Sequence, residues 1–204
     1  MDELRCGMVD VAFALAGDTL PREHRRALAE ALTARLPWLA ELPRAGVHRI
    51  NVSAGAGPQA LLSHRSRLTL RVPREHADRL AVLAGAELDL GGRRLRLEGP
   101  PQLRELLPHG TLYAHVVAAE GGDELDFLAA VDVELGTLGV AGRCICGRQQ
   151  ALDGGELALS GYSLMLDGLS PDHARRLLEA GIGPHRLWGC GLFVPHKSAA
   201  AVGH

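Results

Sequence analysis

One order of segments runs twice through this sequence of 204 residues, and it limits the folds that the chain can adopt. Each pass has an alternating apolar segment, a helical segment, two more alternating segments, a second helical segment and a last alternating one. Alternation with a period of two is typical of half-buried strands, whereas apolar residues three or four apart indicate the buried stripe of a helix. The pattern therefore predicts strand-helix-strand-strand-helix-strand, repeated once.

The first pass occupies residues 1–100. Its first strand is MVDVAFALA, and a helix is expected from about Pro21 to Leu36, with its leucines four residues apart. VHRINVSA, SRLTLRV and RRLRLEG are the other expected strands, and residues 74–84 form the second expected helix.

The second pass lies in residues 101–204, and the expected linker between the two halves is 99–110. Its strands are TLYAHVVAA, GRCICGRQQ, LALSGYSLML and CGLFVP, and its helices are DELDFLAAVDVELGTL and a segment that Ser170 caps. Both halves read as a βαββαβ unit, so the predicted class is α+β with two ferredoxin-like (RRM-like) domains in tandem, 1–100 and 101–204.

The charges are segregated along the chain. Residues 1–100 carry 15 arginines and 12 acids, whereas residues 101–204 carry 7 cations and 12 acids. Three stretches, 42–74, 135–152 and 180–204, contain no acid at all. The candidate polyanion-binding cations in them are Arg49, Arg67, Arg71, Arg143, Arg148, Arg186 and Lys197. A solvated basic surface with its acids elsewhere in space is the alternative. Aromatic residues make up only 3%, so base stacking is not expected to dominate.

Composition and motifs also predict what the protein lacks. An apolar run interrupted by Asp10 follows acids at the N-terminus, which indicates neither a signal peptide nor a membrane span. Four cysteines do not suggest a disulfide framework, so we expect a reduced, cytoplasmic protein. Cys144-x-Cys146 has no second Cys or His pair to complete a zinc site, and no GxGxxG opens a helix after a strand. Neither a metal nor a cofactor is expected.

The segment GIGPHRLWGCGLFVPHKS, residues 181–198, is rich in glycine and free of acids. Gly189 and Gly191 have no side chain, so a phosphate backbone could approach their amides closely. Valine at either position is then expected to weaken RNA binding and to leave the fold largely intact. The alternative is a tight turn that leads into a buried strand.

Tandem ferredoxin-like halves with such a loop before the last strand resemble the CRISPR-associated repeat-cleaving endoribonucleases, in particular the myxobacterial-type subgroup. The resemblance lies in LWGCGLFVPHKS, GRCICGRQQ and AGVHRINV, and in ELLPHGTLYAHVVAA and GYSLMLDGLSPDHARRLLEAGIGPHR. Many members have further glycines after the Gly-x-Gly, where this chain has Phe193, Val194 and Pro195.

The resemblance implies metal-independent cleavage of precursor CRISPR RNA by 2′-hydroxyl attack, which leaves a 2′,3′-cyclic phosphate. It also implies CRISPR repeat RNA and effector-complex subunits as partners, with the product RNA kept for that complex. Two rivals stay open. One is a non-catalytic RNA-binding subunit of the same kind of ribonucleoprotein, and the other is an interaction module that never touches RNA.

Three histidines are candidates for the proton transfer that RNA cleavage needs. Several family members carry the working histidine in the region of His48, which here has Arg44 and Arg49 beside it and no acid nearby in the sequence. Others carry it at the start of the first helix, where His24 stands and where the helix dipole favours neutral imidazole. His64 lies in another acid-free stretch. The expected order is His48, then His24, then His64.

Overall fold

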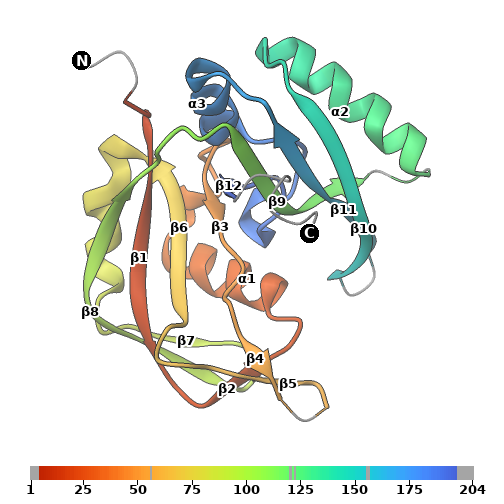
Figure 1. Ribbon diagram of the computed structural model, residues 1–204. Coiled ribbons are helices and arrows are strands. Elements are labelled where there is room, and N and C mark those ends of the chain that lie inside the picture. Colours follow the sequence, from red (N-terminus) through yellow and green to blue (C-terminus); the bar gives the residue numbers. More distant parts are fainter. Residues whose placement is uncertain (1–4, 56, 120, 122, 155–156, 197–204) are drawn as a thin grey trace. The chain divides into compact units, whose positions relative to one another are not determined.

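The computed structural model describes residues 5–55, 57–119, 121, 123–154 and 157–196, and the chain divides into two compact units (Figure 1). We call residues 8–105 together with 187–189 the N-terminal unit, and the rest of the described chain the C-terminal unit. No helix in the described ranges is long and apolar enough to cross a membrane.

The N-terminal unit is built on a five-stranded antiparallel sheet with the order β3-β6-β1-β8-β7. Its elements are β1 (Met8–Ala16), α1 (Arg25–Arg35), β3 (Gly46–Val47), β6 (Arg67–Pro73), the 3-10 helix η2 (Arg74–Leu83), β7 (Glu87–Asp89) and β8 (Arg94–Glu105). A smaller sheet has the order β2-β5-β4. Its strands, and a short 3-10 helix η1, are β2 (Thr19–Pro21), β5 (Gln59–Leu61), β4 (Ser53–Ala54) and η1 (Pro37–Leu39).

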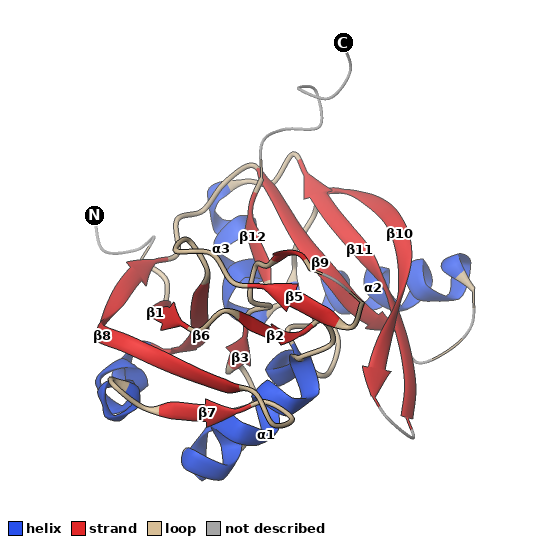
Figure 2. Cartoon of the chain, turned by 90° about the horizontal axis from the view of Figure 1, so that it is seen from below, coloured by secondary structure: helices blue, strands red, loops and turns tan. Residues whose placement is uncertain are grey.

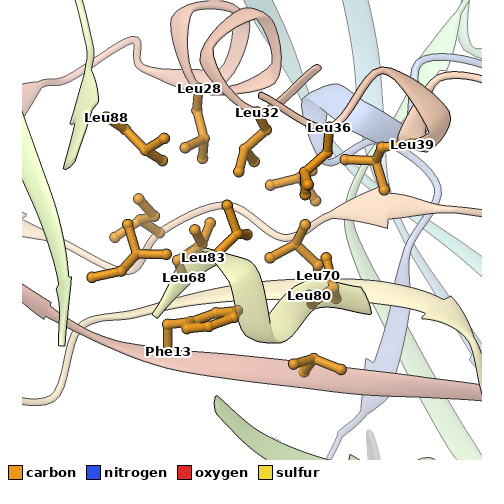
Figure 3. Packing of buried hydrophobic residues seen from close by; sticks show 14 of the residues in the cluster. Phe13, Leu28, Leu32, Leu36, Leu39, Leu68, Leu70, Leu80, Leu83 and Leu88 are labelled. Atoms are coloured by element: carbon orange, nitrogen blue, oxygen red, sulfur yellow. The ribbon is translucent and has the colours of Figure 1, made fainter. Parts of the chain in front are cut away.

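The core of this unit lies between α1, η2 and one face of the larger sheet. Leu28 and Leu32 of α1 are fully buried opposite Phe13 of β1 and Leu68 and Leu70 of β6 (Figure 3). Odd-numbered residues of β1 point into this core, so even-numbered ones, such as Asp10, point to the opposite face of the sheet.

The C-terminal unit is built on a four-stranded antiparallel sheet with the order β10-β11-β9-β12, and it carries α2 and α3 (Figure 2). Its elements are β9 (Thr111–Ala119), α2 (Glu124–Leu138), β10 (Arg143–Gly154), β11 (Leu157–Asp167), α3 (Pro171–Ala180) and β12 (Phe193–Pro195). A last 3-10 helix, η3 (Arg186–Trp188), precedes β12.

The same strand order occurs in both units. Numbered within each βαββαβ pass, the four principal strands are arranged as second, third, first and fourth across the sheet. This is the ferredoxin-like arrangement, so the predicted tandem fold is confirmed.

Local sequence explains how the second-half helices start. Asp123 accepts hydrogen bonds from the backbone amides of Leu125 and Asp126, at 2.8 and 3.1 Å, and forms a capping box. Ser170 accepts one from His173 before the first turn of α3. By contrast, α1 has no side-chain cap and no acid in its first turn. The positive end of that helix therefore remains uncompensated by its own first turn.

Three expectations about the first half differ from the structure. Pro21 belongs to β2, because its segment pairs with β5, and α1 starts only at Arg25. The strand expected over VHRINVSA is reduced to β3 and β4, with irregular chain between them. The boundary between the units follows Glu105 instead of residue 100, because β8 continues into the expected linker as far as Glu105 and pairs there with β1.

Candidate functional site

His24 lies directly before the first turn of α1 and is completely buried. Its Nδ1 lies 3.0 Å from the Pro21 carbonyl oxygen, which can only accept, so Nδ1 carries the proton and Nε2 is the basic nitrogen. Nε2 has no hydrogen-bond partner within the described residues. Burial lowers the pKa of His24 to about 4 against the hydrogen bond to Pro21, and the charges of Arg25 and Arg49 add to the decrease. The imidazole is therefore neutral at pH 7.

Chain segments that are distant in sequence meet beside this histidine. Arg25 Nη1 donates to the Trp188 carbonyl oxygen at 3.1 Å. A β-carbon added to Gly189 would lie 3.3 Å from both Arg25 Nη1 and the backbone nitrogen of Arg49, so this glycine packs directly against them. We call His24, Arg25, Arg49 and the backbone of Trp188 and Gly189 the cationic cluster. It joins the start of α1, the chain after β3 and the glycine-rich segment.

Arg49 is the half-buried member of this cluster. Its side chain makes no ion pair and no hydrogen bond within the described ranges, and its charge acts on His24. Arg25 is buried, and sequence analysis missed it because it reads as an ordinary first-turn residue of a helix. The signal that could have found it is its position next to a candidate histidine in a helix start without acids.

His48 lies on the other face of the sheet, with a carboxylate beside it. Val47, the last residue of β3, is buried in the core, and the His48 ring that follows it lies beside Asp10, on the face opposite α1. There its Nε2 lies 3.3 Å from Asp10 Oδ1. The expectation that His48 has no acid near it is therefore wrong. Asp10 is 38 residues away in the sequence, and only the pairing of strands brings the two side chains together.

Asp10 also holds Arg71, its direct partner across β1 and β6. The Arg71 guanidinium donates to both carboxylate oxygens, at 2.8 and 3.0 Å. Burial alone would raise the pKa of Asp10, but the charges of His48 and Arg71 keep this pKa well below its usual range. Arg71 is 1% exposed, so its guanidinium is held by Asp10 inside the protein, and the expected RNA contact of Arg71 stays a prediction that this packing disfavours. We call Asp10, His48 and Arg71 the ionic triad.

The two glycines of the Gly-x-Gly are required by the packing of the protein itself. Gly191 is buried, with a φ of 67°, and its amide donates to the Val116 carbonyl oxygen at 2.8 Å. An added β-carbon would overlap the Ile182 carbonyl oxygen. Gly189 is also buried, and its φ is 79°. The Gly191 amide is therefore already hydrogen-bonded within the C-terminal unit and does not point to an RNA phosphate. The expectation that valine at this position leaves the fold intact is wrong.

Other candidate cations bind backbone carbonyls. Arg186 is half-buried and donates from Nη1 to the Ala180 carbonyl oxygen at the end of α3. Arg67 Nη1 donates to the carbonyl oxygens of His64 and Ser66, both at 2.8 Å. These contacts stabilise a helix end and a turn of the protein itself. They favour the alternative interpretation, in which Arg67 and Arg186 belong to the protein's own surface and do not bind a polyanion. Lys197 lies outside the described residues.

Comparison with known proteins decides the family. Residues 9–198 match the family described as Cas6, "Cas6 Crispr". The chain belongs to the Cas6 family. The "CRISPR-associated endonuclease Cas6" of Myxococcus xanthus is 36% identical to it over 195 residues, which are 95% of this chain and 84% of that protein. The resemblance drawn from the sequence is therefore confirmed.

Solved structures of Cas6 proteins share the fold. A structure described as "CRISPR associated protein Cas6" has a TM-score of 0.68 at 10% identity and covers 93% of this chain and 100% of its own. A Cas6-related protein from Pyrococcus furiosus has a TM-score of 0.59 at 16% identity, with coverage of 92% and 98%. At these identities the likeness shows the tandem ferredoxin-like fold alone.

Two cations of this Cas6-family chain lie exposed on β10. Arg143 donates to Asp167 at 3.0 Å and keeps 66% of its side-chain surface exposed. Arg148 lies within the irregular register between Cys146 and Gln149, and its side chain makes no ion pair or hydrogen bond in the described part of the chain. Arg148 is thus the freer of the two for an external anion.

The histidine, cysteine and acidic residues that the structure describes form no group of three or more that could hold a metal ion. Cys144 and Cys146 are half-buried and unpaired with one another. Burial and nearby negative charge raise the pKa of both thiols.

Proposed function

We propose that this Cas6-family chain is an endoribonuclease that cuts CRISPR repeat RNA within a precursor transcript. The observation that carries the proposal is the cationic cluster, in which segments distant in sequence bring two arginines whose charges act on one neutral imidazole. The cut RNA is then retained for an effector complex. Family membership supports the reaction class, and the cluster supports the place where it occurs.

RNA supplies its own nucleophile, so the protein needs only a base and a cation. In our proposal Nε2 of His24 takes the proton of a 2′-hydroxyl, and the oxygen attacks the adjacent phosphorus. The bond to the 5′-oxygen breaks, and this oxygen takes up a proton from water while the imidazolium returns its own proton to solvent, which leaves a 2′,3′-cyclic phosphate on one fragment and a 5′-hydroxyl on the other. Arg49 and Arg25 balance the charge that develops on the phosphate, so no metal ion is needed in this scheme.

The geometry favours His24 over His48 for the proton transfer. His24 lies within the cationic cluster, where a phosphate is attracted, and its tautomer leaves Nε2 basic. Nε2 of His48 contacts the Asp10 carboxylate, which also forms a buried ion pair with Arg71. His48 remains the second candidate for the acid–base group.

One observation favours the non-catalytic alternative. Because His24 is completely buried in the RNA-free protein, RNA must uncover Nε2 before a 2′-hydroxyl can reach it. If RNA binding does not uncover His24 Nε2, the protein would bind repeat RNA through the same cations without cutting it. Binding and cleavage must therefore be measured separately.

The test is incubation of the purified protein with repeat RNA in EDTA. We expect one cut per repeat, and a 3′ end that cannot be extended until a cyclic phosphate is removed. A repeat RNA with a single 2′-deoxynucleotide directly on the 5′ side of the mapped cut should bind normally and stay intact. A control repeat RNA with the 2′-deoxynucleotide two positions away should still be cut. Binding without any cut would establish the RNA-binding alternative, and cleavage that EDTA abolishes would contradict the metal-independent scheme.

A further inference from the structure

The ionic triad lies next to the cationic cluster in the chain but on the opposite face of the sheet. His48 and Arg49 are consecutive residues directly after β3. The His48 ring faces Asp10, and the Arg49 backbone packs against Gly189, beside Arg25. A contact that fixes His48 therefore also restrains the position of Arg49.

The backbone alone holds this segment weakly. Strand β3 is only two residues long, Gly46–Val47, and pairs with β6 on one side. Beyond it, the His48 amide donates to the Thr69 carbonyl oxygen at 2.9 Å. Residues 48–52 belong to no strand. The contact of the His48 ring with Asp10 is thus the last side-chain anchor before Arg49.

The partner of this anchor is rigid. Asp10 lies in the middle of β1, between β6 and β8, and two hydrogen bonds from Arg71 fix both carboxylate oxygens. Arg71 is itself 1% exposed, so its guanidinium is held away from water. A carboxylate held in this way offers His48 Nε2 one position at 3.3 Å.

We propose that His48 is a positioning residue that, through Asp10 and Arg71, holds Arg49 beside His24. This inference rests on the proposed function of the cationic cluster and gives the ionic triad a role in it. A side chain that fills this role needs a hydrogen-bond donor where Nε2 lies, and it needs no ability to transfer a proton. Glutamine places an amide nitrogen near that position and cannot act as an acid or a base.

The experiment compares His48→Ala with His48→Gln, each alone and combined with Arg49→Ala, in single-turnover cleavage and in repeat-RNA binding. We expect His48→Ala to slow cleavage roughly 10- to 100-fold, which is the scale of a misplaced group. His48→Gln should stay within about threefold of the wild-type protein, because the anchor is kept. In the Arg49→Ala background, His48→Ala should have almost no further effect, because the two changes remove the same contact.

Two outcomes overturn the inference. If both His48 variants lose at least about 10³-fold in cleavage with unchanged binding, His48 is the acid–base group itself. If His48→Ala binds and cuts like the wild-type protein, the anchor does not position Arg49. Thermal unfolding of each variant guards against a general loss of fold, and His48→Gln serves as the folded comparison if His48→Ala is unstable.

Failure of the proposed function gives a different result. If the wild-type protein binds repeat RNA but never cuts it, the proposed reaction is wrong and the inference is decided by binding alone. The inference then requires that His48→Ala bind repeat RNA more weakly than the wild-type protein and that His48→Gln bind like the wild-type protein. In the Arg49→Ala background, the two His48 variants should bind equally. Equal binding by all of these variants would overturn it.

Discussion

The two faces of the β3-β6-β1 sheet treat similar side chains in different ways. On the face that carries α1, the charges of Arg25 and Arg49 act on a neutral histidine, His24. On the opposite face, His48 and Arg71 share the carboxylate of Asp10. The difference teaches that an acid-free stretch of sequence says little about the charge around its residues. One aspartate from another strand neutralises Arg71 and leaves Arg49 unaffected.

His24→Ala tests most directly whether the two faces of the sheet differ in function. If the cationic cluster is the reactive face, this change should slow single-turnover cleavage by roughly 10²- to 10⁴-fold, the usual contribution of one acid–base group. Repeat binding should change little, because a neutral imidazole adds little affinity for phosphate. His64→Ala is the matched control, since His64 is exposed and lies in another acid-free stretch. Wild-type cleavage by His24→Ala would move the reaction away from this face.

The glycine-rich segment gives the next largest effect, on folding. Gly191 and Gly91 have similar backbone angles, with φ of 67° and 64°, but only Gly191 has no room for a β-carbon. Gly91→Ala should cost about 1 kcal/mol of unfolding free energy from the backbone alone. Gly191→Ala should cost about 3 kcal/mol or more, because the Ile182 carbonyl group must also move. Equal losses in urea unfolding would mean that the segment is looser than the packing indicates.

Burial of His24 predicts a dependence of stability on pH. An unfolded histidine titrates near pH 6.5, whereas burial lowers the pKa of His24 to about 4 in the folded protein. The unfolded chain therefore binds more protons between these values, so the unfolding free energy should fall as pH drops from 6.5 to 4, by up to roughly 3 kcal/mol. Asp10 contributes only at lower pH, because its pKa is held below the usual range. His24→Gln should flatten the decrease in urea titrations at pH 7 and pH 4.5, and an unchanged slope would show that another group causes it.

The smallest expected effect separates the two exposed cations of β10. Arg148→Ala should weaken repeat binding by about 1 kcal/mol and reduce the slope of log affinity against log salt by about 1, as for one lost phosphate contact. Arg143→Ala should have less effect, because Arg143 already pairs with Asp167. The wild-type slope itself should be steep. A flat plot would remove phosphate binding as the main source of affinity, and equal losses from both variants would show that the Asp167 pair does not matter.

Much of the fold followed from the chain's own periodicities. Alternation located β1, β6, β9, β10 and β11, and apolar stripes with caps located α2 and α3, because these signals are local. The middle of the first half was harder to predict. The chain between β3 and β6 has only the short strands β4 and β5, and its position depends on contacts with residues far away in sequence.

The sequence by itself determined the two ferredoxin-like passes, the family, and which stretches lack acids, since each depends only on residue order. Only the tertiary structure decided which charges meet. Strand pairing joined Asp10 to Arg71 and His48, while the chain after β3 brought the Arg49 backbone against Gly189. Packing also engaged the Gly191 amide and buried His24. The physical reason is that Coulomb interactions and burial depend on distance in space, and two-residue alternation sends neighbours in sequence to opposite faces of one sheet.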